Sequence, residues 1–156
     1  MGTVPAQRQI KQANEFMGVL SGKLDIADCA VLGKQPQCRK QAEAGEQAAL
    51  FQWARLNEKK YPELALLFHI PNGGKRDAIE GAHLKAQGVK SGVPDIFLPS
   101  PKGKHHGLFI ELKAHGGRVR ESQRAWLDAL AGQGYKTAVC YGFDEAREKI
   151  EKYMKT

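Results

Sequence analysis

The stretch that decides the fold is HHGLFIELKAHG, residues 105–116. A short apolar run bounded by glycines is typical of a strand that is covered by the rest of the protein. Two opposite charges, Glu111 and Lys113, nevertheless lie inside this run. Because the side chains of a strand alternate between its faces, both charges share one face with Phe109, and the other face is apolar. An unpaired buried charge is costly, so the strand predicts a partner or a metal ion beside Glu111.

A second acid, Asp95, lies in VPDIF (93–97) at the start of another expected strand. The two strands are joined by the basic segment PSPKGKHH (99–106), which suits a hairpin-like connection. Pairing of the strands would bring the carboxylates of Asp95 and Glu111 together.

Periodicity and Gly, Pro and Asn punctuation predict the remaining elements. Helices are expected at residues 42–59, 77–87, 121–132 and 143–154. Strands are expected at residues 64–70, 94–98, 107–113 and 136–141. This order predicts an α/β fold with a small mixed β-sheet flanked by helices. Residues 1–40 are expected to be an appendage with one possible helix at 7–20, and residues 41–156 to form one domain.

The chain has 156 residues and carries 24 Lys and Arg against 17 Asp and Glu, a formal net charge of +7. This excess favours polyanionic partners, with nucleic acid first and a membrane surface second. No segment approaches the ~18 apolar residues of a membrane span, and no signal-peptide pattern is visible, so we expect a soluble intracellular protein. The wide spacing of Cys29, Cys38 and Cys140 favours free thiols over a disulfide framework or a zinc site.

Two helices repeat the anomaly of a polar side chain on an apolar face. Glu46 is followed by apolar residues three, four and seven positions later, which places its carboxylate on the apolar stripe of the helix. Gln123 has the same relation to the apolar residues of its own helix. Two strand acids, one helix acid and one helix amide are therefore expected to converge.

Clustered carboxylates without His or Cys spacing favour a hard cation such as Mg²⁺ or Mn²⁺. Beside a metal-bound water, Lys113 could orient or deprotonate the nucleophile and offset charge on a phosphoryl transition state. Phosphodiester hydrolysis needs such a set of groups. The alternative is that Glu111 and Lys113 form a solvated ion pair, with Asp95 in a turn and Glu46 as an ordinary helix acid.

Two basic segments are candidate phosphate contacts. The first, a glycine turn followed by cations, consists of Asn72, Gly73, Gly74, Lys75 and Arg76. The second, close to Gln123, contains Arg118, Arg120 and Arg124. In both segments the alternative is a loop with solvated charges.

Three segments, GVPDIF (92–97), IELK (110–113) and SQRAW (122–126), resemble the core of the PD-(D/E)xK nuclease superfamily. The ordered set that adds GEQAALFQWA (45–54) and HIPNGGKRD (69–77) more specifically resembles the VRR-NUC family, whose small stand-alone members occur in phages and bacteria. The resemblance covers about residues 43–142.

This resemblance implies a restriction-endonuclease-like core and a divalent-metal site. The implied metal ligands are Glu46, Asp95, Glu111 and the Leu112 carbonyl. The implied catalytic residues are Asp95, Glu111, Lys113 and Gln123. Lys113 would act on the attacking water, and Gln123 would support Lys113 or the bound phosphate. The resemblance also favours a DNA-backbone contact for the first basic segment, residues 72–76.

We therefore expect a Mg²⁺- or Mn²⁺-dependent DNA endonuclease, selective for branched or nicked DNA such as Holliday junctions, in replication, recombination or repair. Resolving a junction requires two active sites, so a homodimer is expected, in the cytoplasm of a bacterial or phage-infected cell. Two alternatives stay open at this point. One is a non-catalytic DNA-binding module with a nuclease-like fold, and the other is a phosphate-handling enzyme that acts on nucleotides or RNA.

Overall fold

The computed structural model of the chain describes residues 36–71 and 78–156. The chain divides into two compact units, Met1–Cys38 and Arg39–Thr156. The second unit contains the sheet and the helices that cover it, and it is the unit described below. The expected helix at residues 7–20 and the basic segment at residues 72–76 lie outside the described residues.

The sheet has four strands in the order β1–β2–β3–β4. Their bounds are β1 Phe68–His69, β2 Ile96–Leu98, β3 Leu108–Lys113 and β4 Lys136–Tyr141. β1 pairs with β2 and β2 pairs with β3 in antiparallel fashion, whereas β3 and β4 are parallel. The sheet is therefore mixed, and β2 and β3 pair side by side, as the sequence predicts.

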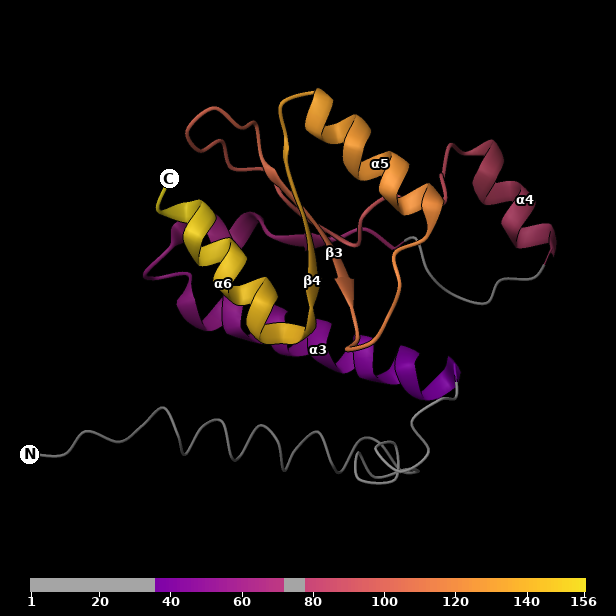
Figure 1. Cartoon of the computed structure of the whole chain (residues 1–156), viewed down its shortest axis with the longest axis horizontal. Helices are drawn as coiled ribbons and strands as arrows, with labels where there is room; N and C mark the ends of the chain where they lie inside the picture. The colour runs from indigo at the N-terminus through magenta and orange to yellow at the C-terminus, as the bar shows by residue number, and fades with distance from the viewer. Residues whose placement is uncertain (1–35, 72–77) are drawn as a thin grey trace, which may run out of the picture. The chain divides into compact units, whose positions relative to one another are not determined.

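Four helices accompany this sheet (Figure 1). Their bounds are α3 Pro36–Asn57, α4 Ala78–Ala86, α5 Glu121–Gly132 and α6 Gly142–Met154. α5 supplies the crossover that the parallel β3–β4 pair requires, and it packs against β4. α6 packs against both β3 and β4. None of the described helices is long and apolar enough to cross a membrane.

The strand expected at residues 64–70 is mostly wrong. A 3₁₀ helix, η1, occupies Pro62–Leu66, and only the two residues of β1 pair as a strand. Pro62 explains the difference, because its fixed φ favours the first turn of a helix and η1 begins at this residue. Within η1, the side chain of Leu64 is buried in the core, whereas Leu66 is exposed.

Every residue of β3 is buried, as expected for a strand covered on both faces. The apolar face packs into the main core with side chains of α3 and α6. The core residues concerned are Leu108, Ile110 and Leu112 of β3, Leu50 of α3, and Ala146 and Ile150 of α6. On the opposite face, the ring of Phe109 stacks on Phe97 at a centroid distance of 4.0 Å. Glu111 and Lys113 continue this second face and are therefore charges inside the protein.

Candidate active site

The pairing of β2 with β3 brings Asp95 to the charged end of β3. Ile96 lies opposite Ile110, so Asp95 precedes β2 beside the last residues of β3. The Leu112 N–H donates a hydrogen bond to Asp95 Oδ2 at 3.0 Å. This contact orients the Asp95 carboxylate across β3, toward the side chain of Lys113.

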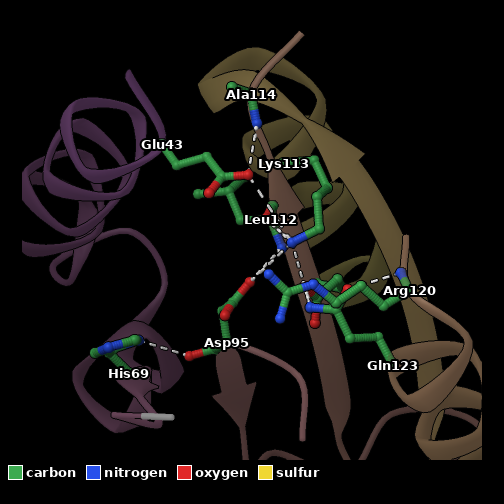
Figure 2. Close-up of polar contacts among 9 residues, drawn as sticks. Glu43, His69, Asp95, Leu112, Lys113, Ala114, Arg120 and Gln123 are labelled. Carbon is green, nitrogen blue, oxygen red and sulfur yellow. Dashed lines mark hydrogen bonds and ion pairs between the residues drawn. The ribbon is translucent and has the colours of Figure 1, made fainter. Parts of the chain in front are cut away.

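The Lys113 ammonium lies at the centre of the site (Figure 2). Its Nζ donates to Glu111 Oε1 and to the Leu112 carbonyl, the latter at 3.0 Å. Asp95 Oδ2 lies 4.0 Å from the same nitrogen. The ammonium therefore contacts or approaches oxygens of Glu111, Leu112 and Asp95, and Lys113 is itself only 8% exposed.

Glu111 is fully buried, and its two oxygens have different surroundings. Oε1 accepts hydrogen bonds from Lys113 and Gln123. Oε2 is buried and has no hydrogen-bond partner in the part of the chain that the structure describes. Burial raises the pKa of Glu111 to about 7, the neighbouring Asp95 carboxylate adds to the rise, and Lys113 opposes it.

Gln123, on the first turn of α5, connects this helix to β3. Its Nε2 donates to Glu111 Oε1, and its Oε1 accepts the Arg120 N–H at 3.0 Å. Gln123 thus contacts Glu111, whereas the family resemblance implied Lys113 or a phosphate as its partner. A single amide side chain joins the start of α5 to the buried carboxylate.

The two acids of α3 have different partners. Glu46 Oε2 accepts the Phe143 N–H at 2.7 Å, at the first turn of α6. Glu43 Oε1 instead accepts the Ala114 N–H at 3.2 Å and lies 3.9 Å from Lys113 Nζ. Reasoning from the sequence singled out Glu46 and missed Glu43. The available signal was the three-residue spacing, which places Glu43 on the same helix face as Glu46.

The oxygens in this cluster suit a hard divalent cation. Within residues 36–71 and 78–156, no group of three or more His, Cys, Asp or Glu side chains is arranged to hold a metal ion. The donors present are carboxylates and a backbone carbonyl, which are the ligand types of Mg²⁺ and Mn²⁺. The buried Glu111 Oε2 still lacks a partner among the described residues. The donor set therefore fits such a cation.

Three arginines lie close to Gln123 in the sequence, before α5 and in its first turn. Arg118, Arg120 and Arg124 are all exposed. In Figure 2 the Arg120 side chain extends from the start of α5 toward Asp95 and Lys113. The other expected basic contacts, Asn72, Gly73, Gly74, Lys75 and Arg76, lie outside the described residues.

The segment that precedes Asp95 packs closely against α5 and is hydrogen-bonded to it. Ser91 accepts a hydrogen bond from the indole Nε1 of Trp126 through its carbonyl, at 3.1 Å. Gly92 has φ +86°, and a Cβ at this position would lie 3.0 Å from the backbone carbonyl of Ser122. Only glycine fits this approach without strain. The position of Asp95 thus depends on α5 as well as on β3.

Comparisons with known proteins agree with this arrangement. A family model described as the VRR-NUC domain matches residues 33–144. A solved structure titled "VRR_NUC domain protein" has 29% sequence identity and a TM-score of 0.63, and the match covers 73% of this chain and 88% of that chain. No curated protein sequence matches the chain. Since the family model matches most of the chain, this protein belongs to the VRR-NUC family, a family of nucleases.

Proposed function

We propose that this protein is a divalent-metal-dependent DNA endonuclease that hydrolyses phosphodiester bonds. One observation carries the proposal. Oxygens of Asp95, Glu111 and Leu112 surround Lys113 Nζ, beside a buried Glu111 Oε2 without a hydrogen-bond partner in the described residues. This set combines hard oxygen ligands with an amine next to them, which suits metal-assisted phosphodiester hydrolysis.

Asp95, Glu111 and the Leu112 carbonyl are the proposed ligands of Mg²⁺ or Mn²⁺. Glu46 is a further proposed ligand, from the family resemblance, although its Oε2 accepts the Phe143 N–H in the structure. When bound, the cation supplies a more acidic water molecule and charge stabilisation at the reacting phosphoryl group.

The chain's own residues would do the remaining work. Lys113 orients the attacking water and offsets negative charge on the phosphoryl oxygens, because its ammonium lies beside the ligand oxygens. Gln123 holds the Glu111 carboxylate in one orientation through its hydrogen bond to Oε1. Glu111 and Lys113 are both buried, so bulk water is kept away from their charges. This exclusion of water strengthens their electrostatic effect.

The substrate is proposed to be DNA held through its phosphates. The exposed Arg118, Arg120 and Arg124 can bind phosphates as two-pronged donors near the cluster. A formal net charge of +7 favours the same polyanion. The segment 72–76 is proposed as a second DNA-backbone contact on the basis of its sequence.

Branched or nicked DNA, with the Holliday junction as leading example, is the proposed substrate structure. The support is the resemblance to compact stand-alone members of the family, and the implied roles are in DNA replication, recombination or repair. Symmetric cleavage of a junction needs two active sites, so we propose a homodimer acting in the cytoplasm of a bacterial or phage-infected cell.

The testing experiment is cleavage of labelled linear duplex, nicked duplex, flap, four-way junction and single-stranded DNA. The full chain and Glu111→Gln, which keeps the side-chain size but loses the charge, are compared with Mg²⁺, Mn²⁺ or chelator. We expect cleavage that needs the metal and falls at least about 100-fold in the variant, as for loss of a charged ligand. Undiminished cleavage by Glu111→Gln, or by wild type in chelator, would overturn the proposal.

One observation favours a second candidate, a non-catalytic DNA-binding module. Glu111 and Lys113 already pair with each other inside the protein, which a purely structural ion pair would also do. In the same experiment, a module would bind the labelled DNA and cut none of the panel with either metal.

A further inference from the structure

The Lys113 ammonium contacts the oxygens that we propose as metal ligands. It donates to Glu111 Oε1 and to the Leu112 carbonyl, and it lies 4.0 Å from Asp95 Oδ2. An ammonium and a divalent cation beside the same oxygens repel each other, because both are positively charged and lie only a few ångströms apart. Binding of the cation therefore favours a position of Lys113 Nζ farther from them.

Glu43 offers an acceptor for the displaced ammonium. Three carboxylates lie within 4.0 Å of Lys113 Nζ in the described part of the chain, and Glu43 is the one that we do not propose as a ligand. Its Oε1 is held by the Ala114 N–H at 3.2 Å, on the residue that follows Lys113. The acceptor is thus anchored to the same strand end as the lysine.

The required movement is small. Glu43 Oε1 lies 3.9 Å from Lys113 Nζ, so a charged hydrogen bond forms after a displacement of about 1 Å. The flexible four-carbon stem of lysine permits such a displacement without a change in the backbone. Figure 2 shows Glu43 on the side of Lys113 that faces Ala114, away from Asp95.

We propose that Glu43 is a positioning residue that receives the Lys113 ammonium when a divalent cation takes the oxygens of Asp95, Glu111 and Leu112. The inference rests on the proposed metal-dependent function. Glu43 keeps Lys113 at the edge of the site, within reach of the attacking water, after the ammonium has left the ligands. Without Glu43, the displaced charge has no fixed carboxylate to accept it, and cation binding becomes less favourable.

The test is a double-mutant cycle in Mn²⁺ affinity, measured by calorimetry on the full chain without DNA. Lys113→Met removes the competing ammonium and is expected to tighten Mn²⁺ binding about 10-fold, the usual size of one strong electrostatic coupling. Glu43→Gln is expected to weaken binding about 10-fold. In the Lys113→Met background, Glu43→Gln is expected to change Mn²⁺ affinity less than about 2-fold, because no ammonium remains to be received.

Asp128→Asn is the matched control, since it removes one carboxylate from an exposed position on α5. It is expected to leave Mn²⁺ affinity unchanged, which separates a local effect from the change in net charge. Circular dichroism and urea unfolding of all variants show that they remain folded.

Two results would overturn the inference while the proposed function stands. One is a wild type that binds Mn²⁺ and cuts DNA while Glu43→Gln weakens Mn²⁺ binding equally in both backgrounds, which would make Glu43 act on the cation directly. The other is unchanged Mn²⁺ affinity in Lys113→Met. A wild type that neither binds Mn²⁺ nor cuts any DNA of the panel would overturn both the proposed function and this inference.

Discussion

Glu111 shows at the scale of one residue why this strand contains charges. Its carboxylate has no exposed surface, and Oε2 lacks a hydrogen-bond partner in the described part of the chain. Lys113 and Gln123 contact only Oε1. Burial raises the pKa of Glu111 to about 7, Lys113 opposes the rise, and the Asp95 carboxylate adds to it. A cation beside Oε2 would stabilise the charged form of this carboxylate.

Gln123 is the residue whose loss separates orientation from charge. Gln123→Leu removes the donor to Glu111 and the acceptor for the Arg120 N–H. We expect kcat to fall about 10- to 100-fold, the usual effect of removing a group that orients a ligand, and stability to fall by about 1–3 kcal/mol. Cleavage assays and urea unfolding measure the two effects. Gln52→Leu, at an exposed position of α3, is the control. Equal kcat in both variants would contradict the role of Gln123 in orienting Glu111.

At the scale of elements, α3 contacts two other elements through two acidic residues that lie one turn apart. Glu43 reaches the end of β3, and Glu46 reaches the start of α6. A carboxylate that accepts an N–H in the first turn of a helix also interacts favourably with the positive end of the helix dipole. Glu46 therefore has a structural partner in α6, independent of any role at the cluster.

Substitution of Glu46 tests this structural role. Glu46→Ala is expected to destabilise the protein by about 1 kcal/mol, since the Phe143 N–H loses its acceptor. Glu46→Gln keeps an oxygen acceptor and should cost less, about 0.3–1 kcal/mol for the lost interaction with the helix end. Urea unfolding measures both variants. If Glu46→Ala is as stable as wild type, the contact of Glu46 with α6 does not contribute to stability. A separate Mn²⁺ titration of Glu46→Gln shows whether Glu46 is a metal ligand.

The segment before β2 depends on its close approach to α5. Gly92→Ala places a Cβ 3.0 Å from the Ser122 backbone at φ +86°, so both backbone strain and a clash result. Gly88→Ala is the matched control, because φ is +91° and the space around it is open. We expect Gly92→Ala to lower the free energy of unfolding by at least about 1 kcal/mol more than Gly88→Ala does. We also expect it to cleave DNA more slowly, because Asp95 moves. If urea unfolding shows equal losses of stability in the two variants, the close approach of Gly92 to α5 does not contribute to stability.

At the scale of the whole molecule, positive charge determines which partner is favoured. The formal net charge is +7, and the arginines near the cluster are exposed. Phosphate contacts release counterions from DNA, so affinity is expected to fall steeply with salt. The charge excess alone favours a polyanion, and the exposed Arg118, Arg120 and Arg124 are the residues that we propose to contact its phosphates.

Salt dependence of binding tests this distribution of charge. In chelator, log K for a labelled duplex is expected to fall linearly with log salt, with a slope that decreases by about 1 in Arg124→Ala. Arg55→Ala, at an exposed position about 18 Å along α3 from Glu43, is expected to leave the slope unchanged. Fluorescence anisotropy at several salt concentrations measures the slopes. The same slope in both variants would place Arg124 outside the DNA contact.

The sequence by itself determined which face of β3 carries charge and which strand lies beside it. Alternation in a strand depends only on backbone geometry, so Glu111 and Lys113 could be assigned to one face from spacing alone. The short connection to Asp95 likewise predicted the β2–β3 pair, which the structure contains. The ordered motifs predicted the VRR-NUC family, and the family model confirmed it.

Only the tertiary structure decided which partner each polar side chain meets. Helix periodicity predicts the face on which Glu43 and Glu46 lie, but their partners depend on how α3 lies against β3 and α6. The same holds for Gln123, whose contact with Glu111 follows from the packing of α5 beside the sheet. Such contacts join residues far apart in the chain, and their distances are determined by packing between elements, which local periodicity does not encode.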